Sequence, residues 1–489
     1  MGLAAALPSR STATAARTDR LPEWAYLLPA STGRVMTALA GDDVPVDTLA
    51  ARVGSDDVLY WEVDRRAPGQ LALTPARAFA RLTRLGLTPI AAYWVKPGFP
   101  HRRMYLPLAS QPALRWYIDT LYRSETRGRR LLKHALRAVA AWGQLGAVAP
   151  CYAIIATRGA RPADARPHTV LLAHATEAWS RVALVPMETG GSAPSTVIKL
   201  PRTSAFNEQV EWEHRVQQHL HAVLPPTLRE SIPQSRAVEW GELTALVETA
   251  APGAPLTSRI GVPAEDPLDD LRLATRWLGA FHTATLQVRT PAREWLTRRL
   301  VHGLCRNYAE AFTLTDAETH LFGRLERHLN ACGAVTLPLA WHHTDFGPWN
   351  VYRDGRTLRV IDWEVARVGP GVADMLYFAM HWGAAVAGRT TPAAQVEYFA
   401  SLFCTRTAAD PVSLGIHEYV AAYLHRTGLH WSLLPALLAY TVLEQAVDLV
   451  RRRAAAGTPS RDRATNPYVA YLAAMAEHVD ALMPQGEAR

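Results

Sequence analysis

Cysteine and lysine are both scarce in this chain of 489 residues. The four cysteines show no Cys-x-x-Cys spacing, which argues against a disulfide scaffold or a cysteine-based metal site and favours free thiols in a reducing compartment. Only three lysines occur, at positions 96, 133 and 199, against a large excess of arginine. The arginines are spread without a long basic block, so the net charge of +8 does not indicate a nucleic-acid partner.

We expect neither a signal peptide nor a membrane span in this chain. Its first residues are rich in alanine, serine and arginine but have no apolar core, so we expect a disordered tail over residues 1–29. The uncharged segment from Ala138 to Thr157 contains Gln144 and helix-loosening glycines, which fit a helix ending near Gly146 and then a strand. We therefore expect a cytoplasmic protein with no membrane partner.

Residues 30–158 are predicted to form an α/β domain. Strands are expected over 58–63, 89–95 and 151–157, and a helix is expected to begin at Thr74-Pro75. This order resembles the C-terminal half of a class I methyltransferase-like sheet, a weak resemblance over about a hundred residues. Because Gly41-Asp42-Asp43 is not the Gly-rich turn that binds the cofactor in that fold, an accessory domain without chemistry is the favoured interpretation.

The most informative stretch runs from Trp341 to Asp374. Asp345 follows His343 by two residues and precedes Asn350 by five. Two apolar arms, 350–352 and 358–361, then flank an Asp-Gly pair, which predicts a β-hairpin that returns Asp362 close to Asn350. Two carboxylates and an amide oxygen in one place are ligands that suit Mg²⁺.

The pattern His-x-Asp-x-x-x-x-Asn, followed about a dozen residues later by Ile-Asp-Trp-Glu, resembles the core of the aminoglycoside phosphotransferase and choline kinase family. That resemblance covers about residues 169–400 and implies an α+β, two-lobed protein-kinase-like fold. It implies that Asp345 is the catalytic base, and that Asn350 and Asp362 hold the metal. His343 is expected to brace the catalytic loop, and Glu364 to support the metal site or to face solvent.

The same resemblance assigns the nucleotide-binding residues. Lys199 lies in a predicted strand over 196–200, where an ammonium would reach the phosphates, although a lysine on an edge strand is the plainer alternative. Glu213, on a predicted helix over 206–220, is the best match for its partner, with Glu208 and Glu211 as rivals. Backbone groups near Glu248 and Thr249 are expected to contact the adenine edge.

The predicted organisation is a tail (1–29), the partial methyltransferase-like domain (30–158), a linker (159–168), a kinase-like N-lobe (169–252) and a helical C-lobe (253–489). The predicted activity is transfer of the ATP γ-phosphate, with Mg²⁺, to a hydroxyl of a small molecule. The alternative is a catalytically silent kinase-like nucleotide-binding or scaffold protein. Arg451-Arg452-Arg453 ends a predicted helix over 433–450, where it complements the helix dipole better than it suits a phosphate site. The acceptor, the choice of ATP or GTP, the loop over the phosphates and the oligomeric state stay open.

Overall fold

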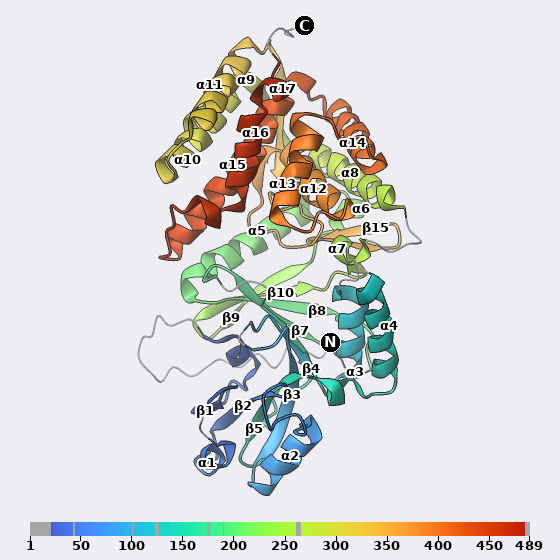
Figure 1. The fold of residues 1–489 in the computed structure, drawn as a ribbon, viewed down its shortest axis with the longest axis vertical. Helices are drawn as coiled ribbons and strands as arrows, with labels where there is room; N and C mark the ends of the chain where they lie inside the picture. Colours follow the sequence, from blue (N-terminus) through green and yellow to red (C-terminus); the bar gives the residue numbers. More distant parts are fainter. Residues whose placement is uncertain are drawn as a thin grey trace. The chain divides into compact units, whose positions relative to one another are not determined.

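The computed structural model describes residues 21–42, 45–99, 101–122, 127–173, 177–188, 190–260 and 266–484. The chain folds into two compact units, and Figure 1 shows its helices and strands. The first unit contains Met1–Arg215 and Pro233–Pro252, and the second contains Val216–Ile232 and Gly253–Arg489. The division therefore falls inside one helix, α5 (Asn207–Val223).

The first unit is built on a ten-stranded sheet with the strand order β1-β2-β5-β3-β4-β6-β7-β8-β10-β9. Its strands are β1 (Val35–Ala38), β2 (Val58–Asp64), β3 (Thr88–Lys96), β4 (Met104–Pro107), β5 (Cys151–Thr157), β6 (Thr169–Leu172), β7 (Arg181–Pro186), β8 (Thr196–Pro201), β9 (Ser235–Trp240) and β10 (Leu243–Thr249). Its helices, besides α5, are α1 (Val46–Ala50), α2 (Pro75–Arg84), α3 (Gln111–Trp116) and α4 (Arg127–Ala141), with short helical turns at η1 (Glu23–Leu27), η2 (Tyr117–Leu121), η3 (Leu145–Val148) and η4 (Ser204–Phe206).

Most strands and helices predicted from the sequence are present within a few residues of their predicted ends. Thr74 caps α2 through its side chain, with Pro75 in the first turn, as its sequence indicates. The uncharged segment from Ala138 forms the end of α4, a short turn and then β5, which confirms the prediction of a helix followed by a strand.

One sheet spans both the predicted N-terminal domain and the predicted N-lobe. β4 pairs antiparallel with β6, with Met104 opposite Leu172 and Tyr105 opposite Leu171. The predicted linker (159–168) connects β5 to β6, and both strands belong to this sheet. The fold of the first unit is thus one continuous sheet, where the sequence predicted two domains joined by a linker.

The two faces of this sheet are covered differently, because side chains alternate along each strand. Val58 and Tyr60 of β2 pack in the cluster that includes the N-terminal turn η1. Leu59 and Trp61 point to the other face, where they pack with residues of α2. Further along that sheet, α3 and α4 supply apolar residues to a third cluster.

The predicted disordered tail (1–29) is wrong in its last part. Glu23–Leu27 forms a turn of 3₁₀-helix, and Tyr26, Leu27 and Leu28 are buried. The apolar side chains of this segment pack on the sheet, which stabilises it despite the polar sequence before it. Residues 1–20, the rest of that prediction, lie outside the described residues.

The second unit is mostly helical, around one large apolar core. Its longer helices are α8 (Pro267–Ala284), α11 (Asp316–Ala331), α12 (Val372–Val386), α14 (Pro411–Thr427), α15 (Leu434–Ala455) and α16 (Pro467–Glu477). Its shorter helical segments are α6 (Pro226–Arg229), α7 (Leu256–Arg259), α9 (Ala292–Leu296), η5 (Thr297–Cys305), α10 (Arg306–Ala311), α13 (Pro392–Phe399), η6 (Ala400–Cys404), η7 (Trp431–Leu433), η8 (Arg463–Thr465) and α17 (Val479–Leu482).

Two small sheets complete the second unit and carry its polar residues. One has the order β11-β14-β15 and the other β12-β13-β16. Their strands are β11 (Ala254–Pro255), β12 (Leu286–Pro291), β13 (Thr336–His342), β14 (Val351–Asp354), β15 (Thr357–Val360) and β16 (Arg367–Pro370). β13 is the middle strand of its sheet, so the segment that leaves it at His342 starts from a fixed point.

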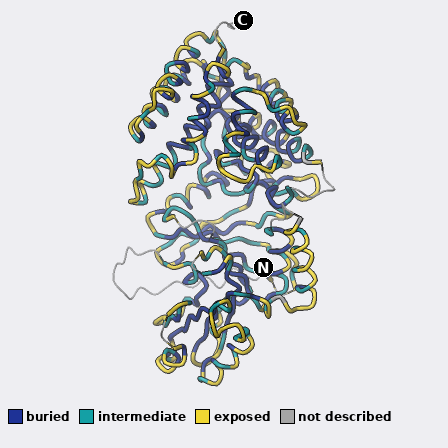
Figure 2. Tube along the Cα trace, in the orientation of Figure 1, coloured by how far each residue is buried: buried dark blue, intermediate teal, exposed yellow. Residues whose placement is uncertain are grey.

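One helical segment in the described part of the chain, Trp431–Ala455, is long and apolar enough to cross a membrane. Within its most apolar stretch, however, 78% of the residues are buried inside the fold. Figure 2 shows the dark blue of buried residues gathered inside the helical unit. This burial is what a central core helix requires.

Candidate active site

A buried ion-pair cluster surrounds Lys199 in the first unit. Lys199 Nζ lies 2.9 Å from Glu213 Oε1 and 3.0 Å from Glu248 Oε1. β8 supplies the lysine, α5 supplies Glu213, and β10, the neighbour of β8, supplies Glu248. All three residues are less than one-tenth exposed, so two carboxylates fix the ammonium in a site with little water.

Glu213 also accepts a hydrogen bond from Arg181 of β7. The other two glutamates considered for this role, Glu208 and Glu211, are exposed on α5. The structure therefore places Glu213 against Lys199 and leaves its two rivals at the surface. Arg181 was not identified from the sequence, because an arginine at the start of a strand carries no motif.

Two backbone N–H groups at the end of β10, where the adenine contact is expected, already donate hydrogen bonds. The Thr249 N–H donates to the Gln234 carbonyl at 2.9 Å, and the next N–H, of Ala250, donates to the Ser195 carbonyl at 3.0 Å. Both donors are used within the sheet, because β10 lies between β8 and β9. The adenine contact of backbone groups near Glu248 and Thr249 stays a prediction, and the Glu248 side chain contributes to the Lys199 cluster.

The second cluster begins where the chain leaves β13, in the second unit. The carboxylate of Asp374, near the start of α12, accepts the N–H of His343 at 2.7 Å and that of Thr344 at 2.8 Å. Thr344 has a φ of 66°, a strained value for a β-branched residue, and these bonds hold it there. His343 Nε2 lies 2.8 Å from the Ile361 carbonyl, so this histidine also ties the segment to the hairpin.

Asp345 lies half-buried beside Asn350. The Asn350 side-chain amide donates to Asp345 Oδ2 at 2.9 Å and to the Asp345 carbonyl at 3.0 Å. Burial and the charge of Asp362 raise the pKa of Asp345 to about 7, while hydrogen bonds from Tyr377 and Trp349 act in the opposite direction. A carboxylate with a pKa near neutrality is well suited to accept a proton in catalysis.

The predicted hairpin is confirmed. β14 and β15 pair antiparallel with Val351 opposite Val360, and the Ile361 N–H donates to the Asn350 carbonyl at 3.0 Å. Gly355 adopts a φ of +58° in the tight turn, a conformation that favours glycine. The next residue after Ile361 is Asp362, so the hairpin brings Asp362 to Asn350, and its charge acts on Asp345.

The donor set at the end of this hairpin fits Mg²⁺. Asn350 uses its amide N–H₂ on Asp345, which leaves its amide oxygen as the group available to a cation. Asp362 supplies a carboxylate close by. Within the described residues no group of three or more His, Cys, Asp or Glu side chains is arranged to hold a metal. Few protein ligands, all of them oxygen, are what Mg²⁺ takes, because it keeps several of its waters.

Glu364 has a definite partner in the structure. Its Oε1 lies 3.1 Å from Arg452 Nη1, and Arg452 Nε lies 2.7 Å from Asp448 Oδ2. Arg452 is on α15, and its charge lowers the pKa of Asp345. From the sequence we favoured a helix-dipole role for this arginine over a phosphate-binding one, whereas the structure places it in the network around Asp345.

Tyr377 is a further site residue that was not identified from the sequence, besides Arg181 and Arg452. It donates to Asp345 and lies 3.0 Å, hydroxyl to hydroxyl, from Tyr468. A signal was present, because Tyr377 follows Asp374 by three residues on α12 and therefore points to a similar side of the helix. The sequence does not show that α12 packs against the segment after β13, and this packing brings Tyr377 to Asp345.

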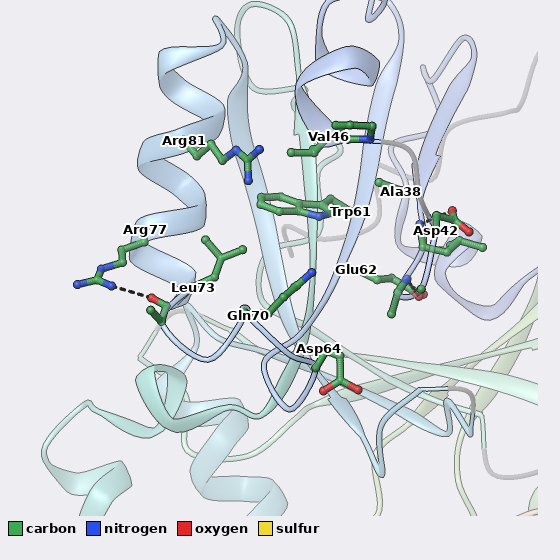
Figure 3. A pocket seen from close by; sticks show the side chains of 17 residues that line it. Ala38, Asp42, Val46, Trp61, Glu62, Asp64, Gln70, Leu73, Arg77 and Arg81 are labelled. Carbon is green, nitrogen blue, oxygen red and sulfur yellow. Dashed lines mark hydrogen bonds between the residues drawn. The ribbon is translucent and has the colours of Figure 1, made fainter.

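The N-terminal part of the first unit contains a pocket of about 530 Å³, at the carboxyl ends of β1 and β2 (Figure 3). Its charged residues are largely paired within the fold. Glu62 is buried and accepts from Arg102 at 2.7 Å and from the Ala40 N–H at 3.0 Å. Arg81 pairs with Asp47 at 2.7 Å. The pocket is therefore roomy but presents few unpaired polar groups, and we assign it no chemistry.

Comparison with known proteins finds a family match over part of this chain. Residues 187–409 match the model of the phosphotransferase enzyme family (APH). The match confirms the resemblance found at Asp345, Asn350 and Asp362, all of which lie inside it. It begins after residue 158, so the methyltransferase-like resemblance of residues 30–158 receives no support and stays a prediction.

Similar solved structures include two phosphotransferases and a kinase. A thermostable mutant of aminoglycoside phosphotransferase APH(4)-Ia is 15% identical, with 64% of this chain and 94% of that chain covered and a TM-score of 0.40. Macrolide 2'-phosphotransferase MphH from Brachybacterium faecium is 16% identical (64% and 91% covered, TM-score 0.36). Amicoumacin kinase hAmiN, in complex with AMP-PNP, Ca²⁺ and Ami, is 12% identical (65% and 89% covered, TM-score 0.38).

These structural similarities are too distant to carry an argument about activity or acceptor. A comparison with curated protein sequences finds no match. The functional argument therefore rests on the family match and on the contacts around Lys199 and Asp345.

Proposed function

We propose that the chain is an ATP- and Mg²⁺-dependent phosphotransferase that transfers the γ-phosphate to a hydroxyl of a small molecule in the cytoplasm. The observation that carries this proposal is the half-buried Asp345, with its pKa raised to about 7 and its position fixed by Asn350 and Tyr377. A carboxylate of this kind serves as a general base near neutral pH.

Each residue then has a defined part in the reaction. Asp345 accepts the proton of the acceptor hydroxyl, whose oxygen forms a bond to the γ-phosphorus as the bond from that phosphorus to the β–γ bridging oxygen breaks and ADP leaves. Lys199, fixed by Glu213 and Glu248, contacts the nucleotide phosphates through its ammonium. Asn350 and Asp362 hold Mg²⁺, which neutralises charge on the phosphates.

The alternative is a catalytically silent kinase-like protein that binds a nucleotide or acts as a scaffold. A silent protein of this kind is expected to lack at least one of the residues that bind the nucleotide and the metal or act as the base. Here Lys199, Glu213, Asp345, Asn350 and Asp362 all occur, and each lies in one of the two clusters described above. The intact set favours catalysis.

The test compares ATP consumption by the wild type and by Asp345→Ala across a panel of hydroxyl compounds with Mg²⁺. We expect the variant to lose at least about a hundredfold in turnover, since a positioned base contributes roughly that factor or more. ATP affinity should change little. Asp354→Asn, an exposed carboxylate in the turn of the same hairpin, is the matched control and should keep wild-type turnover. Equal turnover by wild type and Asp345→Ala would reject the assignment.

A further inference from the structure

The second unit contains a small cavity of about 70 Å³ bordered by η5, α10, α15 and β16. Arginine dominates its charged lining, which comprises Arg299, Arg367, Arg451, Glu444 and Asp448. Its volume holds a few waters or one small chemical group, well below the size of a complete ligand pocket. The cavity is therefore the size of a subsite.

Both acidic residues of the cavity are already neutralised by arginine. Glu444 Oε1 lies 3.0 Å from Arg367 Nη2 and also accepts from the Tyr440 hydroxyl. Asp448 pairs with Arg452, one helical turn further along α15. The charge that remains uncompensated in the cavity is therefore positive, which suits an anionic ligand.

Three arginine groups at the cavity are left with unused donors. Arg299 and Arg451 are exposed, and within the described part of the chain neither makes a hydrogen bond or an ion pair. Arg367 has a buried Nε without a hydrogen-bond partner. A buried, unpaired donor is costly, and an anion would satisfy it. Guanidinium groups match carboxylate and phosphate oxygens in geometry as well as in charge.

The cavity and the proposed base are bordered by the same helix. Gln445 of α15, next to Glu444, donates its side-chain N–H to the Thr344 carbonyl, one residue before Asp345. Arg452, the partner of Asp448, acts electrostatically on Asp345. α15 therefore carries residues of both places, Gln445 and Arg452 toward Asp345 and Glu444 and Asp448 at the cavity.

We infer that this cavity binds a carboxylate or phosphate group of the acceptor, so that the substrates of the proposed phosphotransferase are anionic hydroxyl compounds. That the bound anion belongs to the phosphoryl acceptor rests on the proposed function. The anion site itself is defined by the arginines alone. A cationic acceptor finds no unpaired carboxylate among the charged residues that line this cavity, and a neutral one leaves Arg367 Nε unsatisfied.

The experiment uses the full chain and four probes that share one glycerol-like skeleton: glycerate, glycerol 3-phosphate, glycerol and 3-amino-1,2-propanediol. ATP consumption is measured with each probe for the wild type, Arg299→Gln, Arg451→Gln and the control Arg298→Gln. Arg298 is an exposed arginine on the same η5 segment that does not line the cavity. Binding of glycerate and glycerol 3-phosphate is measured separately by ligand-observed NMR, without nucleotide.

We expect the anionic probes to be used best, and their relative turnover to separate a carboxylate site from a phosphate site. Arg299→Gln and Arg451→Gln should raise KM for the preferred anion about tenfold or more, with kcat and the KM for ATP unchanged. Preference for glycerol or the amine, or a rise in the KM for ATP instead, would overturn the inference.

Failure of the proposed function gives a different result from failure of the anion site. In that case no probe supports ATP consumption, yet the NMR measurement still decides the anion site. Binding of an anionic probe that is lost in Arg299→Gln and Arg451→Gln but kept in Arg298→Gln supports the site. Absence of anion binding by the wild type, or binding that none of the three variants changes, rejects it.

Discussion

Glu213 is a single buried carboxylate that contacts two cations, Lys199 on β8 and Arg181 on β7. Glu248 is the second carboxylate at Lys199, whereas Arg181 also donates to the Gln209 carbonyl. Removal of the Glu213 charge would leave more positive than negative charge in a site with little water. Such uncompensated burial is expensive, even though an intact buried ion pair adds little net stability.

We predict that Glu213→Gln lowers the free energy of unfolding by roughly 3–5 kcal/mol, because it breaks a buried pair and leaves a cation without its counter-charge. Urea unfolding of the full chain measures this change. Glu211→Gln is the control on the same helix, since Glu211 is exposed and its one ion pair among the described residues is with Arg215 at 3.7 Å. An exposed pair contributes about 0–1 kcal/mol, so the control should stay close to wild type. Equal effects of the two substitutions would contradict the assigned role of Glu213.

The start of α12 holds the segment that carries the proposed base, Asp345, in place. Asp374 accepts both N–H groups that precede Asp345, and His282 of α8 lies 3.2 Å from the same carboxylate. The other ring nitrogen of His282 lies 2.7 Å from the Tyr423 hydroxyl of α14. Gly371 allows this close packing, since a Cβ there would lie 2.6 Å from the His282 ring. Three helices thus meet at one buried histidine–aspartate pair.

This pair predicts a loss of stability in mild acid. Burial lowers the pKa of His282, against the opposing effect of Asp374, so the unfolded chain takes up this proton first as the pH falls. The contribution of His282 is complete above its unfolded pKa of about 6.5 and declines below it by at most about 1.4 kcal/mol per pH unit. Burial alone would raise the pKa of Asp374, but the hydrogen bond with His282 and the nearby His342 hold it well below 3.8, so its contribution is lost only below about pH 4.

Urea midpoints at pH 7.5, 6.0 and 5.0 measure this dependence. His282→Gln should unfold more easily at pH 7.5 but should lose less stability than wild type on acidification, because the buried group no longer titrates. His425→Gln, at an exposed position near the end of α14, should keep the wild-type slope. A wild-type midpoint that does not change from pH 7.5 to 5.0 would show that His282 does not carry the predicted linkage.

Across the whole molecule, the sequence predicts best what is decided by neighbours in the chain. The hairpin that carries Asn350 and Asp362 is such a feature, because an Asp-Gly turn and its two arms occupy about a dozen residues. The contacts of Asp345 with Tyr377 and Arg452 are not local, since they depend on how α12 and α15 pack. No motif encodes that packing, and both residues were missed as parts of the site.

The continuous sheet is the largest feature that could not be predicted from neighbouring residues in the sequence. Pairing of β4 with β6 joins Met104 to Leu172 across two helices, two short helical turns and a whole strand. Residues 159–168 have the composition of a linker, but composition does not say whether the strands on either side share a sheet. That choice is made by the buried apolar faces, including Tyr105 and Leu171, which are fully inaccessible to solvent.

We therefore predict that the phosphotransferase part does not fold well without the N-terminal part. A chain starting at residue 169 would leave β6 as an edge strand and expose Val170 and Leu171, both fully buried in the complete protein. An unpaired apolar edge favours aggregation. Size-exclusion chromatography and thermal unfolding should show an aggregated or clearly less stable product compared with residues 1–489.

A cleavage control separates loss of the partner strand from loss of chain continuity. A protease site inserted after Gly159, an exposed residue between β5 and β6, allows the complete protein to be cut once it has folded. We expect the two pieces to remain together through the β4–β6 pairing and to keep the ATP consumption of the uncut chain, since strand pairing and core packing do not need the connecting peptide. If residues 169–489 alone were monomeric and as stable as the full chain, or if the cut pieces separated, the sheet would not be the unit that folds.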